Sequence, residues 1–138
     1  MSRKLGLIEK IVSGEKRIES RWYKNKIAPW DRVNVGDTIY FKYSGGSIIA
    51  QSTVKKVLQI EHLDESKFQD IVSKYGDLIQ LNDRTYSEYY KRKRYVILIF
   101  LQDSKYLERP FDIDKTGYGY SCAWMCISDK EFTKRIIK

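Results

Sequence analysis

Three charged side chains whose types and spacing could do chemistry lie close to the N-terminus: Lys16, Glu19 and Arg21. A lysine in a partly apolar environment can have its pKa lowered, so that it acts as a base or a nucleophile. A neighbouring carboxylate can transfer a proton or hold the lysine charged, and an arginine presents a planar fork to a phosphate or a base edge. The three residues therefore suit proton transfer or nucleotide binding, whereas charge alone favours a simpler interpretation, a solvated and salt-bridged strand.

The segment that carries these side chains has the alternation of a β-strand. Apolar or small residues alternate with charged ones, which predicts a strand over residues 16–23 with two different faces. Glu19 and Arg21 then point the same way and can interact across one pleat. Lys16 follows Gly14, a residue type that commonly ends a helix, and is expected to lie outside the core.

The whole chain predicts a mixed α+β barrel built from five strands. The strands are expected over residues 16–23, 37–43, 48–61, 95–102 and 121–127. Helices are expected over residues 3–13, from the cap residue Asp64 to Gly76, from Asn82 into a basic run, and from Ser128 through Ile136. Gly45 and Gly46 predict a hairpin turn, and a phase change near Lys55 predicts a bulge that helps the sheet to curl. Residues 104–116 are expected to form a loop.

Composition restricts the classes of protein to which the chain can belong. A formal net charge of +8 over 138 residues favours polyanionic partners such as nucleic acid. With two cysteines and one histidine the chain lacks the four ligands of a usual structural zinc site, so neither a metal nor a cofactor is expected. No secretory signal is visible, and the longest apolar run, residues 95–101, is far shorter than the roughly 20 residues of a membrane span. We therefore expect a soluble cytoplasmic protein without a membrane partner.

The spacing of the charged residues also resembles a family signature. Gly14, Lys16, Glu19 and Arg21 spell G-x-K-x-x-E-x-R, which is similar to the motif of ASCH domains, members of the PUA-like superfamily. Residues 35–41 look like the hydrophobic-Gly-Asp strand entry of that superfamily. The segments 43–46, 74–77, 117–119 and 123–124 look like those of a related group of uncharacterised archaeal PUA-like proteins. The resemblance implies one domain over residues 1–138, a small curled β-barrel of about five strands with flanking helices.

The resemblance further implies that the motif faces a cleft between the sheet and its helices. The residues expected to contact a nucleotide or base there are Lys16, Glu19, Arg21, Trp22, Tyr43, Ser44, Gly45 and Tyr118. A glycine-rich turn such as residues 43–46 lets a base or phosphate approach the backbone, although the same residues suit an ordinary hairpin. Tyr118 lies in a glycine–tyrosine segment that fails the dinucleotide-binding fingerprint, so only the resemblance places it near the cleft.

A run of four cations, Lys91, Arg92, Lys93 and Arg94, follows two tyrosines. Cationic side chains bind phosphates and aromatic rings stack on bases, so this run is a candidate contact for a nucleic-acid backbone. A solvated helix end, whose cations complement the helix dipole, fits the same residues.

These observations lead to a non-catalytic module with a basic cleft that binds nucleic acid, RNA above all, or a modified nucleoside. The alternative is an enzyme. Some small bacterial ASCH proteins hydrolyse acylated cytidines with the motif lysine, a threonine at the position of Glu19, and a distant glutamate. Here the catalytic residues would be Lys16 with Glu19 or with Asp77, the nearest plausible acid, in an amidohydrolase or a ribonuclease. A protein–protein adaptor is a third class, for which no sequence feature argues directly.

Overall fold

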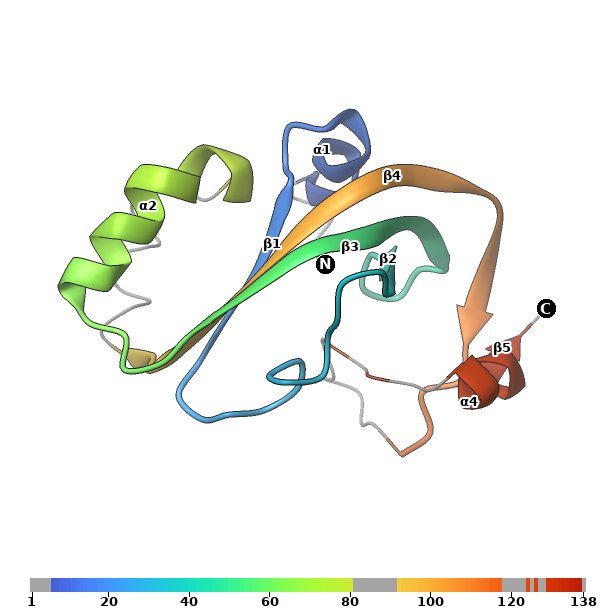
Figure 1. Cartoon of the computed structure of the whole chain (residues 1–138). Coiled ribbons are helices and arrows are strands. Elements are labelled where there is room, and N and C mark those ends of the chain that lie inside the picture. Colours follow the sequence, from blue (N-terminus) through green and yellow to red (C-terminus); the bar gives the residue numbers. More distant parts are fainter. Residues whose placement is uncertain (1–5, 81–91, 118–123, 125, 127–128, 138) are drawn as a thin grey trace.

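The computed structural model of the chain describes residues 6–80, 92–117, 124, 126 and 129–137 (Figure 1). In chain order the elements are α1 (Leu7–Ser13), β1 (Ile18–Tyr23), β2 (Thr38–Lys42), β3 (Ile48–Ile60), α2 (Glu65–Ile79), β4 (Tyr95–Ile113), α4 (Asp129–Arg135) and β5 (Ile136–Ile137). No helix among the described residues is long and apolar enough to cross a membrane.

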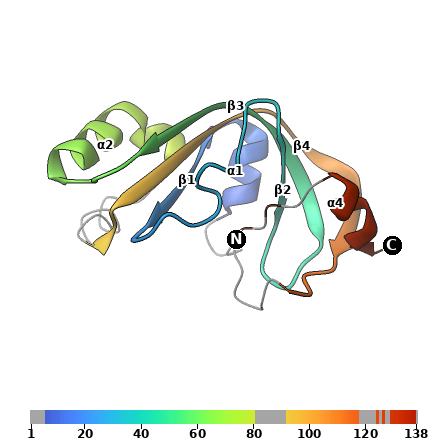
Figure 2. The same cartoon turned by 60° about the horizontal axis from the view of Figure 1, so that its bottom comes forward.

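The strands form one curved antiparallel sheet. Its order is β1-β4-β3-β2, and β5 pairs with the far end of β4. The two longest strands, β3 and β4, run side by side along the molecule, with α2 at one end and α4 with β5 at the other (Figures 1 and 2). Within the described residues this sheet stays open rather than closing into a barrel. The predicted α+β fold of about five strands with flanking helices is confirmed, whereas the described strands are all antiparallel and do not form the predicted mixed barrel.

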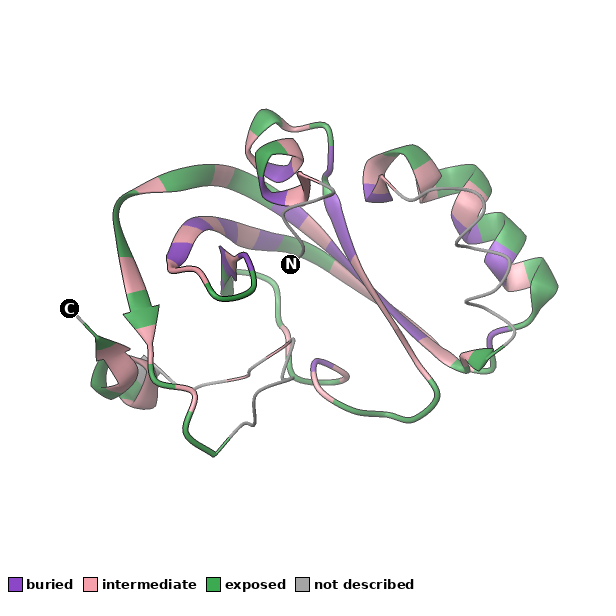
Figure 3. Ribbon diagram, turned by 180° about the vertical axis from the view of Figure 1, so that it is seen from behind, coloured by how far each residue is buried: buried purple, intermediate pink, exposed green. Residues whose placement is uncertain are grey.

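Two hydrophobic cores lie on opposite faces of this sheet. The α1 core contains Ile8, Ile11, Ile39, Phe41, Tyr43, Ala50, Val54, Ile97, Ile99 and Leu101. The α2 core contains Ile18, Leu63, Phe68, Ile71, Ile79, Val96 and Leu98. Successive residues of β4 alternate between the two cores because strand side chains point to opposite faces. The first part of β4, residues 96–99, is therefore buried on both sides, whereas its second half is mostly exposed (Figure 3). The most apolar strand lies centrally, as predicted.

The predicted helix ends are confirmed at two places and wrong at a third. Gly14 ends α1 with a left-handed φ of 88°, and the Asp64 carboxylate accepts a hydrogen bond of 2.8 Å from the backbone nitrogen of Lys67. The prediction that Gly76 ends α2 is wrong, because the helix continues to Ile79. Ile79 is fully buried, and this burial outweighs the roughly 1 kcal/mol that an interior glycine costs a helix.

The predicted bulge near Lys55 is confirmed by a register shift between Val54 and Lys56. The predicted loop over residues 104–116 is wrong, because β4 continues to Ile113. Pairing with β3 and then with β5 stabilises this extension, and Pro110 falls in a gap of the β3 register between Tyr106 and Phe111. A proline is tolerated where no ladder hydrogen bond is needed from it.

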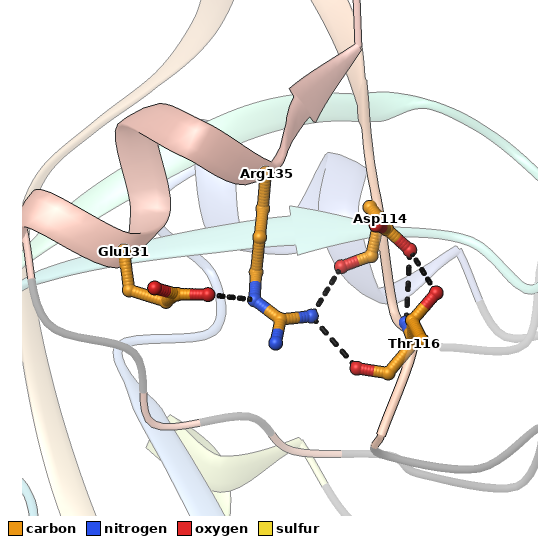
Figure 4. A network of polar contacts seen from close by, with 4 residues as sticks. All are labelled: Asp114, Thr116, Glu131 and Arg135. Carbon is orange, nitrogen blue, oxygen red and sulfur yellow. Dashed lines mark hydrogen bonds and ion pairs between the residues drawn. The ribbon is translucent and has the colours of Figure 1, made fainter.

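The C-terminal helix is anchored to the end of β4 by a network that we call the C-terminal clamp: Asp114, Thr116, Glu131 and Arg135 (Figure 4). Arg135 Nη1 donates to the carbonyl oxygens of Asp114 at 2.9 Å and Thr116 at 2.8 Å, and its Nε donates to Glu131 at 3.0 Å. The predicted C-terminal helix is thus present, although Ile136 belongs to β5. The predicted helix from Asn82, the strand 121–127 as a whole and the cap at Ser128 fall outside the described residues.

Candidate functional site

The strand β1 presents different side chains to the two cores. Its register pairs Glu19 and Arg21 with two isoleucines of the α1 core, so both side chains point to that face, as the alternation predicts. Trp22 lies on the opposite face, where its ring meets Phe68 of α2 edge to face at 6.1 Å. The structure therefore separates Trp22 from the charged residues with which it was grouped.

Lys16 is buried, with 4% of its surface exposed, and the prediction that it lies outside the core is wrong. Its Nζ donates to the carbonyl oxygen of Ile18 at 2.9 Å and to that of Ile79 at 2.7 Å. Ile79 is the last residue of α2, and terminal helix carbonyls need partners from outside the helix. The side chain of Lys16 supplies one, and the negative end of the helix dipole favours a cation at this position.

Burial changes the acid–base chemistry of Lys16. Desolvation lowers the pKa of its amine, and the nearby cations Arg21 and Lys10 add to that effect. The Glu19 carboxylate, whose Oε2 lies 3.9 Å from Lys16 Nζ, raises the pKa but does not outweigh burial. The amine therefore loses its proton more readily than an exposed lysine does.

Glu19 links Lys16 to Arg21, and we call these three residues the charged triad. Glu19 Oε1 lies 3.3 Å from an Nη atom of Arg21, and the exposed fraction of the Glu19 side chain is 8%. Two further polar atoms, Glu19 Oε2 and Arg21 Nε, are buried without a hydrogen-bond partner. Buried polar atoms nearly always have partners because an unmade hydrogen bond costs about 1–3 kcal/mol. The triad thus contains one buried acceptor and one buried donor that make no hydrogen bond.

Arg21 is the member of the triad nearest to solvent. Its guanidinium carbon lies 5.1 Å from the ring centroid of Trp124, within cation–π distance. Trp124 packs against the α1 core, as does Tyr23, the next residue of β1 on this face. The arrangement puts a flat cation beside a large aromatic ring at the edge of a buried ion pair.

The remaining described residues that the sequence predicted for the site have no contact with the triad among the interactions given above. Tyr43 is buried, its hydroxyl donates to Glu9 of α1, and burial raises the pKa of that hydroxyl. Ser44 and Gly45 form the exposed tip of the β2–β3 hairpin, where Gly45 has a φ of 75°. Asp77 is exposed on the last turns of α2. Tyr118 lies outside the described residues.

The described part of the basic run lies at the far end of β1. The backbone nitrogen of Arg94 donates to the carbonyl of Tyr23 at 2.9 Å, which ties the run to the last residue of that strand. Arg92 and Arg94 are exposed and Lys93 is half-buried, whereas Lys91 falls outside the described residues. The run therefore lies at the end of the strand that carries Glu19 and Arg21, although its contact with nucleic acid stays a prediction.

Sequence reasoning missed two features of this face. The contact between Arg21 and Trp124 joins residues 103 positions apart, and only the family resemblance had drawn attention to Trp124. The burial of Lys16 depends on where α2 ends, which the glycine at position 76 obscured. Within the described residues no group of three or more His, Cys, Asp or Glu side chains could hold a metal ion.

Of the comparisons with known proteins, the one with solved structures bears on the fold. No protein-family model and no curated protein matches the chain. Among solved structures, the ASCH protein of Zymomonas mobilis has a TM-score of 0.68 at 18% identity, over 97% of this chain and 88% of that one. A tyrosine-to-phenylalanine variant of the same protein gives a TM-score of 0.68 at 18% identity, and the alignment covers 97% of this chain and 91% of the variant. A serine-to-alanine variant of that protein gives a TM-score of 0.69 at 18% identity, and the alignment covers 97% of this chain and 89% of the variant. The chain therefore has the fold of these ASCH proteins.

Proposed function

We propose that the protein is a non-catalytic module that binds RNA, or a modified nucleoside, through the charged triad. The observation that carries this proposal is the pair of buried, unpartnered atoms, Glu19 Oε2 and Arg21 Nε, next to an arginine held against Trp124. The ASCH fold supports it at the level of the superfamily. The net charge of +8 suits a polyanion, and such a ligand fits the predicted cytoplasmic location.

A nucleobase carries hydrogen-bond donors and acceptors of the kind that Glu19 Oε2 and Arg21 Nε lack as partners. Its edge carries N–H donors and ring or carbonyl acceptors in one plane, so it can pair with a carboxylate and a guanidinium together. Single-stranded RNA bases are commonly stacked on aromatic rings or on the plane of an arginine while their edges are hydrogen-bonded. Arg21 and Trp124 offer such surfaces, and Glu19 offers the acceptor. A base with an exocyclic amine is therefore expected to bind better than one without.

The test is a titration of the full chain with cytidine and uridine, followed by NMR chemical shifts or calorimetry. Cytidine carries an amine that can donate to Glu19 Oε2, whereas uridine has a carbonyl at that position. We expect cytidine to bind more tightly, and Glu19→Gln to reduce the preference because a neutral amide is a weaker acceptor. Absence of binding by any nucleoside and by short single-stranded RNA would overturn the proposal.

One observation favours the enzymatic alternative. The lowered pKa of Lys16 brings its amine closer to the neutral form that a base or nucleophile requires. Against it, the two backbone carbonyls hold Lys16 Nζ inside the protein, and Glu19 stands where hydrolytic relatives carry a hydroxyl. Acylated cytidine and short RNA are incubated with the protein and the products are separated by chromatography. If the protein turns over acylated cytidine and Lys16→Met does not, the protein is an amidohydrolase. If the same holds for short RNA, it is a ribonuclease, and either result would replace the binding proposal.

A further inference from the structure

A second aromatic surface lies further along β1, at its end. Trp30, from the loop after β1, and Tyr95, the first residue of β4, meet edge to face with their ring centroids 5.3 Å apart. Lys26 reaches over both rings, with its Nζ 5.7 Å from each centroid. Its ammonium also lies 2.7 Å from Glu61, and about half of its side chain is exposed, 48%. We call Trp30 and Tyr95 the aromatic pair; Lys26 lies over it.

This surface shares a face of the sheet with the charged triad. In the β1–β4 register Tyr23 pairs with Tyr95, two residues after Arg21. Two residues along a strand keep the same face and lie about 6.6 Å apart, at roughly 3.3 Å per residue. Trp30 and Trp124 both pack against the α1 core, which confirms that they lie on that face. Arg21 and the Tyr23–Tyr95 pair are therefore one such step apart along β1.

The charges around the aromatic pair are mixed. Arg94 directly precedes Tyr95 and is exposed, as is Arg92. The acidic groups here are Glu61, which pairs with Lys26, and Asp31, whose carboxylate accepts a hydrogen bond of 2.7 Å from Gln59. A lysine that is half exposed can exchange a carboxylate partner for a phosphate with a small change of rotamer.

We propose that Trp30 and Tyr95, with Lys26 over them, form a second base-stacking subsite, so that single-stranded RNA lies along β1 with consecutive bases at Arg21–Trp124 and at this pair. The inference rests on the proposed function, because the first base is the one assigned to the triad. It goes further in fixing the ligand as a strand of at least two nucleotides and in giving its path. The competing explanation is that the rings only close the end of the α1 core.

The experiment measures how affinity depends on ligand length. Cytidine 5′-monophosphate and single-stranded oligocytidylates of two and four nucleotides are titrated into the full chain by calorimetry. The wild type should bind the oligonucleotides more tightly than the mononucleotide. Trp30→Ala should lower tetranucleotide affinity about tenfold, the effect of losing one stacked base, while leaving mononucleotide affinity unchanged.

Lys26→Ala serves as the variant that does not disturb the core, since Lys26 is exposed. It should lower tetranucleotide affinity severalfold and leave the mononucleotide unaffected. Lys56→Ala is the matched control, because Lys56 Nζ lies 5.3 Å from the ring centroid of Phe100, on the α2 face of the sheet. That variant should bind both ligands like the wild type.

The outcomes separate the two proposals. If no ligand binds to the wild type, the proposed function fails and the subsite with it. If the mononucleotide binds but the oligonucleotides bind no more tightly, or if Lys26→Ala and a folded Trp30→Ala retain wild-type tetranucleotide affinity, only the subsite is overturned. Circular dichroism checks the fold of Trp30→Ala; if that variant does not fold, Lys26→Ala alone decides.

Discussion

Two arginine–glutamate pairs in this molecule have the same chemistry and different surroundings. Arg21 pairs with Glu19 in the charged triad, and Arg135 pairs with Glu131 in the C-terminal clamp. The arginine side chains are about equally exposed, at 21% and 19%, but the glutamates differ, at 8% and 45%. Arg135 uses its Nε and Nη1 for three hydrogen bonds, whereas Arg21 Nε is buried without a partner.

Under the proposed function, the difference separates a structural network from one that binds a ligand. In the clamp, Arg135 Nε and Nη1 donate to neighbours in the same chain. The triad encloses a carboxylate among two cations and still leaves a donor and an acceptor unmatched, which is costly unless another molecule completes the set. If this comparison is right, substitutions in the clamp should affect stability alone, and those in the triad should affect binding as well.

The largest expected effect is on stability, from removal of the triad's carboxylate. Glu19→Ala leaves the buried Lys16 and the partly buried Arg21 without their common partner, which should lower the free energy of unfolding by about 3 kcal/mol. The matched change in the clamp, Glu131→Ala, removes a half-exposed partner and should cost less than about 1 kcal/mol. Urea unfolding followed by circular dichroism measures both. Equal losses in the two variants would mean that burial does not distinguish the networks.

A second pair of variants compares binding with stability. Arg21→Ala removes a charged donor, so nucleoside affinity should fall by about 1.5–3 kcal/mol, or roughly 10- to 150-fold. Arg135→Ala should leave nucleoside affinity unchanged while lowering the free energy of unfolding by about 1 kcal/mol. Calorimetric titration with cytidine and thermal unfolding of each variant give the two quantities. A loss of affinity in Arg135→Ala comparable to that in Arg21→Ala would refute the division of roles.

Local signals in the sequence were sufficient for much of the fold. The glycine after α1, the Asp64 cap and the phase change near Lys55 each act within a few residues, and the structure confirms them. The alternation along β1 likewise put Glu19 and Arg21 on one face. Such features depend on backbone geometry and neighbouring residues, which a single sequence contains.

The errors arose where tertiary contacts override local preferences. The extent of α2 beyond Gly76 depends on burial of Ile79, and the length of β4 depends on pairing with β3 and β5. The buried position of Lys16 follows from the first of these, because its ammonium binds the carbonyl of Ile79. The sequence shows which residue types can act together, but not which partners they contact in the folded chain.

The basic run offers a smaller effect, on the salt dependence of binding. The double variant Lys91→Ala with Arg92→Ala should weaken binding of single-stranded RNA and reduce the slope of log affinity against log salt by about 1.4, at roughly 0.7 per phosphate contact. Fluorescence anisotropy at several salt concentrations measures that slope. A slope equal to that of the wild type would show that the run is a solvated helix end.

The smallest effect concerns pH and tests the state of Lys16. Because burial lowers the pKa of its amine below the ordinary value of 10.5, the unfolded chain holds that proton more tightly than the folded chain. Between the lowered pKa and 10.5, the folded chain loses this proton before the unfolded chain does, so the cost of burying an ammonium disappears. The free energy of unfolding therefore increases as pH rises through this window. Below the lowered pKa both states are protonated, and the contribution no longer changes with pH.

The measurement compares the wild type with Lys16→Met across the alkaline range. Tyr43 acts in the opposite sense, because its pKa is raised from 10.0, and stability from that group is lost at higher pH. Both proteins contain Tyr43, so the difference between their unfolding free energies isolates Lys16. That difference should change in favour of the wild type as pH approaches 10.5. A constant difference would mean that Lys16 keeps the pKa of an exposed lysine, so that burial of its ammonium has no net electrostatic cost, and the contrast between the triad and the clamp would lose its physical basis at that residue.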